Sequence, residues 1–289
     1  MKNNIGLHYG YWLNDWDGNL VKIIEKIHKI GFSAVEFDSD IMLKRTLKKR
    51  DDLSIKLAQY NLSINFCIGM NKKHDISSEN SKTRERGINH VKEIIKMVNN
   101  MGGDTLSGVC YGEWSPSLDK AKNKTDYLKR SIDSVKQIMI FAEKYGVNYN
   151  IEPVNRYEQF MINTCEEALS YIDEVNSPNL KILLDTYHMN IEEDNMEKAI
   201  LEAGNKLGHF HIGENNRKPP GEGSIINWDN IFEALKKIEY KGDIVMEPFI
   251  NYGGKIGFDT RLWRSMDSKN SDLEGRISNS LDFIKNKLK

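Results

Sequence analysis

The sequence is poor in cysteine, and this shortage excludes proteins that are held together by disulfides or by cysteine-bound zinc. Three cysteines in 289 residues are too few for a disulfide framework, and their odd number and wide spacing also exclude a zinc knuckle. We therefore expect Cys67, Cys110 and Cys165 to be reduced. Cys67 and Cys110 each end an apolar run, which favours plain burial but leaves open that they line a pocket.

Long apolar runs are missing as well. No stretch approaches the roughly 18 consecutive apolar residues that a membrane-spanning helix needs. The first residues, MKNNIGLHYGYW, contain no apolar segment long enough for a secretory signal. The sequence thus predicts a cytoplasmic protein with no membrane partner.

Neither sign of charge is in excess. The 41 basic and 42 acidic residues give a formal net charge of −1, so no general attraction to nucleic acid is expected. Hydrophobic residues make up 39% and charged residues 29% of the chain, values of an ordinary globular protein that argue against disorder. Since no low-complexity linker or composition break interrupts the chain, we expect one domain over residues 1–289.

What the sequence does contain is an alternation of two patterns. Short apolar runs typical of buried strands follow Gly, Pro or Asn residues, which end helices or make turns. Between them, apolar residues recur at spacings of three and four, as in Leu20–Ile30, Ile88–Met101, Ser131–Tyr145 and Asn230–Tyr240. The eight strand-like runs are NIGLHYG, GFSAVEF, NLSINFCIG, GDTLSGV, GVNYNIE, PNLKILLD, GHFHIG and GDIVMEP.

Eight alternations of strand and helix predict an α/β fold, a single (β/α)8 TIM barrel. A doubly wound open sheet is the alternative, but it would usually have fewer units, and no GxGxxG motif follows any run. In a (β/α)8 barrel the functional groups lie at the C-terminal ends of the strands. The strand ends are therefore where site residues are expected.

Four consecutive expected strands end in a carboxylate or an imidazole. These groups are Glu152, Asp185, His211 and Glu247, and they would converge at one rim of the barrel. Three carboxylates and an imidazole without a basic residue among them would repel one another unless a cation lay between them. Oxygen ligands with one nitrogen favour Mn²⁺, Mg²⁺ or Co²⁺ over a structural zinc, which prefers sulfur and nitrogen.

A proline follows both Glu152 and Glu247. Proline biases the preceding residue to extended backbone and cannot donate to the sheet, so each glutamate is held at the point where its strand ends. The alternative for either glutamate alone is a surface ion pair. His209 shares a strand face with His211, and we expect it deeper in the barrel as a hydrogen-bonded core residue. His188 falls in the loop after the sixth run, where it could reach a bound molecule.

Several segments resemble the ketose 3-epimerases, the D-psicose and D-tagatose 3-epimerase group of the xylose isomerase-like barrels. They are NRYE, NLKILLDTYHMNIEED, LGHFHIGENNRKPPGEG, VMEPF and GGKIGFDTRLWR. The likeness covers essentially the whole chain but is weak before residue 145. It implies metal-dependent C3 epimerisation of free ketoses, such as D-fructose/D-psicose or D-tagatose/D-sorbose, through a cis-enediolate. It also implies Mn²⁺ as the preferred ion, a small-molecule ketose as partner, and a homodimer or homotetramer.

The resemblance assigns roles to particular residues. It implies that Glu152, Asp185, His211 and Glu247 bind the metal ion, and that Glu152 and Glu247 are also the two acid–base groups. Glu158, His188 and Arg217 would hydrogen-bond the sugar near its first two oxygens. Trp114, Phe249, Glu36 and His8 would complete the substrate site.

This chain departs from the usual family pattern mainly where the distal part of the sugar is expected. The departures are His8, where an aromatic residue is common, and Cys67, Met70, Glu113 and Pro153. The chemistry is therefore predicted more firmly than the substrate.

Three alternatives on this scaffold remain. An aldose–ketose, hydroxypyruvate or inosose enzyme would differ in the carbon that reacts. A DNA-repair endonuclease would need more zinc ligands and a basic surface. A non-catalytic sugar-binding barrel would be favoured by lost ligands, and none of the four is lost.

Overall fold

A closed barrel of eight parallel strands forms the centre of the protein, in a computed structural model that describes residues 2–266 and 272–289. The barrel closes because β1 pairs with β8 as well as with β2. This closure confirms the predicted (β/α)8 barrel and excludes the open sheet. The strands are β1 Ile5–His8, β2 Ala34–Asp38, β3 Ser63–Gly69, β4 Thr105–Val109, β5 Asn148–Ile151, β6 Leu180–Asp185, β7 Leu207–Ile212 and β8 Ile244–Met246.

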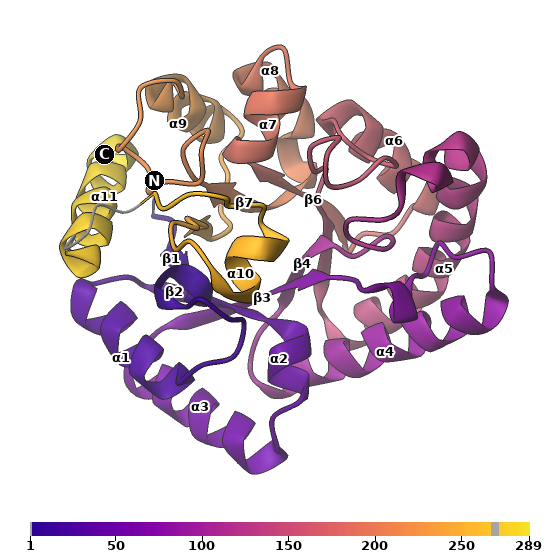
Figure 1. The fold of residues 1–289 in the computed structure, drawn as a ribbon, viewed down its shortest axis with the longest axis horizontal. Helices are drawn as coiled ribbons and strands as arrows, with labels where there is room; N and C mark the ends of the chain where they lie inside the picture. The colour runs from indigo at the N-terminus through magenta and orange to yellow at the C-terminus, as the bar shows by residue number, and fades with distance from the viewer. Residues whose placement is uncertain (1, 267–271) are drawn as a thin grey trace.

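Helices surround the barrel and cover the outside of the strands (Figure 1). The helix α1 has the predicted bounds and ends at Gly31, whose φ of 98° is in the left-handed region that favours glycine. The predicted helix from Ile88 begins earlier, because Asn80 caps it by accepting from the backbone of Thr83. The helices are α1 Leu20–Ile30, α2 Ser39–Leu43, α3 Leu47–Gln59, α4 Ser81–Asn100, α5 Lys124–Tyr145, α6 Cys165–Val175, α7 Thr186–Glu192, α8 Met196–Ala203, α9 Trp228–Lys237, α10 Gly254–Asp259 and α11 Leu273–Leu288.

The two faces of each strand are buried in different surroundings, as β7 illustrates. Phe210 is fully buried and packs against Tyr240, with ring centroids 6.4 Å apart. The neighbouring His209 and His211 are equally buried but meet Glu36 of β2, the strand across the barrel. The apolar core therefore lies between strands and helices, while the barrel interior near the strand ends is polar.

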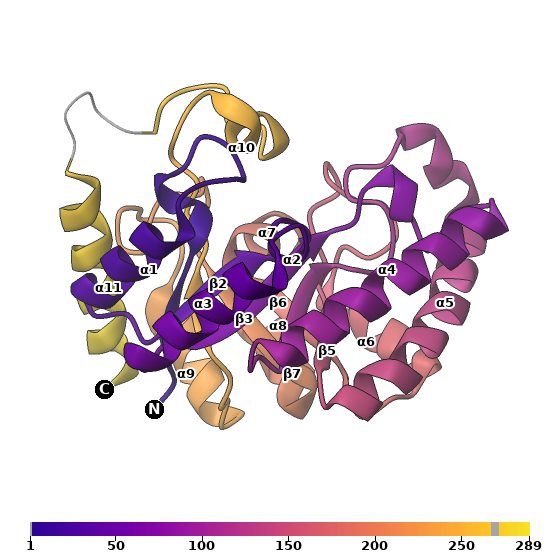
Figure 2. The ribbon, with the colours of Figure 1, turned by 90° about the horizontal axis from the view of Figure 1, so that it is seen from below.

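The C-terminal ends of the strands open toward α10, which lies on the side of the barrel away from both termini (Figure 2). A cavity of about 780 Å³ lies there, lined by strand ends and by Lys255, Phe258 and Asp259 of α10. Within the described ranges, no helix combines the length and apolar character needed to cross a membrane. The fold thus places the predicted site residues around one cavity at one end of the barrel.

Candidate active site

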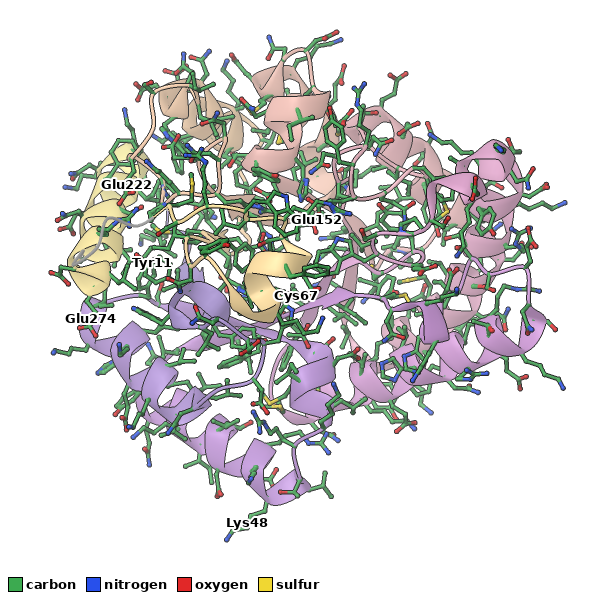
Figure 3. The ribbon with its side chains drawn as sticks, in the orientation of Figure 1. Tyr11, Lys48, Cys67, Glu152, Glu222 and Glu274 are labelled. Carbon is green, nitrogen blue, oxygen red and sulfur yellow. The ribbon has the colours of Figure 1, made fainter. Side chains whose placement is uncertain are left out.

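The ends of β5 to β8 bring the four predicted metal ligands together. Glu152 and Glu247 directly follow β5 and β8, while Asp185 ends β6 and His211 lies in β7. One ligand atom from each of Glu152, Asp185 and His211 lies within 4.8 Å of the other two. Glu247 completes the group, with its Oε2 3.8 Å from Nδ1 of His211. In Figure 3 the labelled Glu152 lies near the middle of the barrel mouth.

The His211 imidazole shows that this set suits a cation. His211 is 1% exposed, and its Nδ1 has no hydrogen-bond partner among the residues described. A buried ring nitrogen without a partner costs free energy, yet this nitrogen faces the carboxylates. A divalent cation would satisfy it together with the carboxylate oxygens. The chemistry of the donor set, three carboxylates and one imidazole, fits Mn²⁺, Mg²⁺ or Co²⁺.

Arg217 supplies a positive charge at the edge of the carboxylate cluster. Its Nη1 donates to Oδ2 of Asp185 and to Oε2 of Glu247, both at 2.7 Å. Its guanidinium carbon lies 3.9 Å from the centroid of the Tyr187 ring. These contacts, in a side chain that is almost buried, fix the guanidinium beside the predicted metal ligands.

The loop after β7 holds Arg217 through Glu214, a residue that the sequence does not single out, whose backbone carbonyl accepts from the N–H of Arg217 at 2.9 Å. Glu214 is fully buried, and its Oε1 accepts from the backbone of Gly221 at 2.7 Å and from Nε1 of Trp228 at 3.0 Å. Arg217 itself adopts a φ of 65°, a conformation that is uncommon outside glycine. An acidic residue inside the specific segment HIGENNRKPPG was the available signal for this role.

The protein groups of the site shift one another's pKa in opposite directions. Burial and the neighbouring carboxylates raise the pKa of Glu152 well above its usual range. Burial would also raise the pKa of Asp185, but Arg217, His188, His211 and the backbone N–H of Tyr187 together lower it below its usual range. Burial would lower the pKa of His211, but the carboxylates, Glu36 first, raise it to about 10. With Glu152, Asp185 and Glu247 all ionised, the cluster would carry excess negative charge beside Arg217, and a divalent cation would balance it.

On the β5 and β6 side, Asn155 positions two predicted substrate residues. Its backbone N–H and its Nδ2 lie 3.1 and 2.9 Å from Nδ1 of His188, so that nitrogen accepts and the proton of neutral His188 is on Nε2. Nδ2 of Asn155 also donates to Oε1 of Glu158 at 3.0 Å, while Nε1 of Trp114 donates to Oε2 at 3.0 Å. His188, Glu158 and Trp114 all line the cavity. The motif NRYE contains Asn155, but spacing alone does not reveal its positioning role.

His188 and Arg217 present two N–H groups to the same place. Nε2 of His188 lies 3.1 Å from Nη2 of Arg217. Since both nitrogens carry protons, neither can accept from the other. The pair is therefore available to a single oxygen atom, the arrangement that stabilises an oxygen gaining negative charge.

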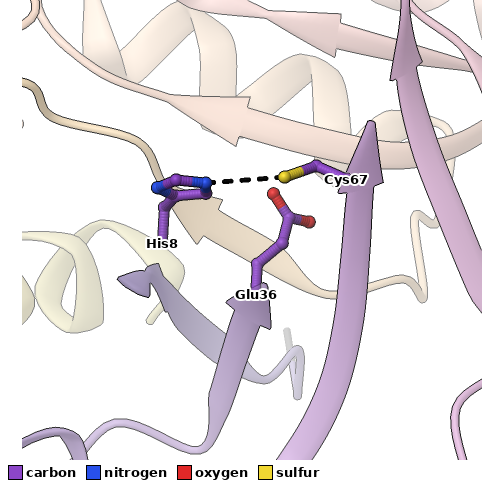
Figure 4. Close-up of side chains that lie close together, drawn as sticks. All are labelled: His8, Glu36 and Cys67. Carbon is purple, nitrogen blue, oxygen red and sulfur yellow. Dashed lines mark hydrogen bonds between the residues drawn. The ribbon is translucent and has the colours of Figure 1, made fainter. Parts of the chain in front are cut away.

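Across the cavity, His8 and Cys67 face each other above Glu36 (Figure 4). Nε2 of His8 lies 3.5 Å from Sγ of Cys67, and Nδ1 accepts from the backbone of Gly10 at 3.2 Å. The three side chains are close enough to hold a cation, but a metal-bound histidine normally donates from its other nitrogen. His8 accepts there, so it presents an N–H group to the cavity. Burial raises the pKa of the Cys67 thiol well above its usual range and keeps it protonated.

The remaining predicted residues differ in where they lie. Phe249 lines the cavity with its ring centroid 5.3 Å from that of His8. Cys67 lines the cavity, whereas Cys110 is fully buried and donates to a backbone carbonyl. Glu36 was expected beside the substrate, but it lies below the cavity lining, where both of its oxygens face histidines. His209 is hydrogen-bonded deep in the barrel, as predicted.

The chain as a whole is similar to proteins of known activity. Residues 24–286 match the family model described as xylose isomerase-like TIM barrel. A D-psicose 3-epimerase of Enterocloster bolteae is 34% identical over 97% of this chain and 94% of its own length. This chain belongs to the ketose 3-epimerase family. An L-ribulose 3-epimerase of Methylomonas sp. is also similar, with 32% identity over 97% of this chain and 96% of its own.

The structural comparison agrees with the family. A crystal structure of D-psicose 3-epimerase with D-tagatose from Clostridium cellulolyticum H10 superposes with a TM-score of 0.95 at 32% sequence identity, covering 99% of both chains. The resemblance, predicted over the whole chain but weak before residue 145, is thus confirmed along almost its full length. The relatives named here are carbohydrate epimerases, so the prediction of an isomerase is confirmed.

Proposed function

We propose that this protein epimerises free ketoses, of the D-fructose/D-psicose or D-tagatose/D-sorbose type, at C3. A divalent cation, with Mn²⁺ the best match, would be held by Glu152, Asp185, His211 and Glu247. The observation that carries the proposal is the convergence of both proline-followed glutamates with the unpaired Nδ1 of His211 at one cavity. Membership of the ketose 3-epimerase family supports the reaction type.

The reaction requires a proton to leave C3, next to the C2 carbonyl, and a proton to return on the opposite face. When bound, the cation would supply Lewis-acid polarisation of the carbonyl. Glu152 and Glu247 come from opposite ends of the four-strand group, so they suit the two faces of the sugar. One carboxylate would take the C3 proton of the substrate while the other delivers a proton to the cis-enediolate, and the roles exchange for the reverse reaction.

The other cavity residues would orient the sugar. Nε2–H of His188 and Nη2 of Arg217 would donate to one oxygen near C1 and C2, with Glu158 accepting from a neighbouring hydroxyl. Trp114 and Phe249 would pack against the carbon faces of the sugar. His8 would donate from Nε2 to a distal hydroxyl. Acidic side chains outnumber basic ones in the lining, which disfavours a phosphorylated sugar.

Product analysis tests this proposal. We expect D-fructose incubated with Mn²⁺-loaded protein to yield D-psicose, and the yield to vanish after chelation. Appearance of an aldose instead would favour the alternative of an isomerase that acts at C1 and C2. The homodimer or homotetramer, the cytoplasmic location and the single-domain organisation stay predictions.

A further inference from the structure

A buried carboxylate, Glu36, lies between two histidines that project into the barrel from β7. The Glu36 side chain is fully buried. Its Oε2 lies 2.7 Å from Nε2 of His209, and its Oε1 lies 2.8 Å from Nε2 of His211. The two imidazole rings are edge to face, with centroids 4.9 Å apart. Each oxygen of one carboxylate thus meets a different histidine.

These contacts are direct. Glu36, His209 and His211 are close enough together to hold a cation themselves. However, separations of 2.7 and 2.8 Å are those of hydrogen-bonded or ion-paired atoms. We therefore interpret the His209 contact as a hydrogen bond and the His211 contact as a close ion pair. The proposed cation site lies on the opposite side of His211, at Nδ1.

The Glu36 contact determines which nitrogen of His211 carries a proton. A lone pair on Nε2 would face an anionic oxygen at 2.8 Å, whereas an N–H group there is attracted to it. Nε2 of His211 and Oε1 of Glu36 do not meet the geometry of a hydrogen bond. The negative charge of Glu36 nevertheless favours a proton on Nε2. Nε2 therefore carries a proton in the neutral and in the charged ring, and in the neutral ring Nδ1 is the nitrogen that offers a lone pair.

We propose that Glu36 is a positioning residue for the cation site, which holds His211 with its proton on Nε2 and its Nδ1 directed at the carboxylates. This inference rests on the metal site of the proposed function. A carboxylate bound to the far nitrogen of a histidine ligand fixes its ring and makes it more basic. His209 supports the arrangement from the other oxygen, because it gives the buried anion a second donor.

Glu36→Gln tests the proposal, because glutamine keeps the size of the side chain and removes its charge. The two histidines lie against different oxygens of Glu36. An amide has only one oxygen, so it cannot accept from both of them. We expect the Kd for Mn²⁺, measured by calorimetry on chelator-stripped protein, to rise about 10- to 100-fold, the usual effect of losing such a partner. The readout is metal affinity and does not depend on turnover.

Asn150→Ala provides the matched control. Asn150 is a fully buried polar residue of β5 whose Nδ2 donates to Ser107 at 2.9 Å, and the cation site does not use it. We expect this variant to lose thermal stability while its Kd for Mn²⁺ stays at the wild-type value. An unchanged Kd in Glu36→Gln overturns the inference. Wild-type protein that binds no Mn²⁺ at all overturns the cation site of the proposed function instead.

A measurement on the unaltered chain covers the case in which Glu36→Gln does not fold. Long-range ¹H–¹⁵N correlation spectra of histidine-labelled protein loaded with Mg²⁺ report which ring nitrogen carries the proton. The expected result for His211 is a proton on Nε2. A proton on Nδ1 overturns the inference.

Discussion

The backbone N–H of Asn155 donates to Nδ1 of His188 at 3.1 Å, and this contact places the His188 proton on Nε2. Nε2 then faces the cavity as a donor, 3.1 Å from Nη2 of Arg217. The loop after β5, which contains Asn155, therefore determines which nitrogen of His188 on α7 donates and which accepts. Together the two N–H groups form a preorganised site for one oxygen atom, which we propose is an oxygen of the sugar.

Loss of the His188 donor is expected to slow the reaction without weakening the binding of the cation. His188→Leu should lower kcat/KM by about 10²- to 10³-fold, the usual loss for one donor to an oxygen that gains charge. The Kd for Mn²⁺ should not change, because His188 is not a proposed ligand. Steady-state kinetics and calorimetry on the same preparation check both expectations, with the exposed Tyr157 changed to phenylalanine as control. Wild-type kcat/KM in His188→Leu would contradict the proposed role.

Either proton carrier should be indispensable. Glu152→Gln and Glu247→Gln each remove a proposed acid–base group, which is worth about 10²- to 10⁴-fold in rate, and also a proposed charged ligand. We expect no detectable epimerisation in either variant when product is followed by chromatography. Glu197→Gln, which alters a residue on the outer helix α8, serves as control. A fully active Glu247→Gln protein would rule out the scheme with two carboxylates.

Removal of the metal ion should destabilise the fold. The cation would balance the excess negative charge of the buried cluster, and binding at 100 times Kd is worth about 2.7 kcal/mol. Chelation should therefore lower Tm in differential scanning fluorimetry, and Mn²⁺ should restore it. In Asp185→Asn the same treatment should have little effect, since a ligand is already lost. Equal shifts of Tm in both proteins would place the ion elsewhere.

The stability of the protein should depend on the ionisation of Asp38, which caps α2. Burial raises the pKa of Asp38 from 3.8 to about 6, so the folded state holds this proton more tightly than the unfolded state. Stability from this residue is complete below about pH 4 and is lost as pH rises through 6, at a cost of about 3 kcal/mol. Asn is an equally good cap and avoids the cost.

Asp38→Asn is therefore expected to be more stable than wild type above pH 6 and equally stable near pH 4. Urea unfolding at several pH values measures the difference. A stability difference that does not change with pH would show that Asp38 ionisation has no part in it.

The barrel could be predicted because the residues that end its helices and strands act locally. Gly31 ends α1 with a left-handed φ, and the prolines after Glu152 and Glu247 mark strand ends. The convergence of the four proposed metal ligands could be predicted for the same reason, because strand ends converge in a closed barrel.

The roles of Glu36 and Asn155 could not be predicted in this way. Glu36 meets His209 across the barrel from a position 173 residues away, and Asn155 acts through the tautomer of His188. Such contacts depend on which side chains meet in three dimensions. Periodicity and spacing carry no information about them, and the resemblance placed Glu36 only at the substrate.

Proton exchange at C3 tests the central claim most directly. Chelator-stripped protein, with and without Mn²⁺, would be incubated in D₂O with D-fructose, D-psicose, D-tagatose and L-ribulose, and the C3 proton followed by NMR. The expected result is a loss of the C3 proton signal that requires Mn²⁺. Exchange at C1 alone, or no exchange with any of these sugars, would contradict it.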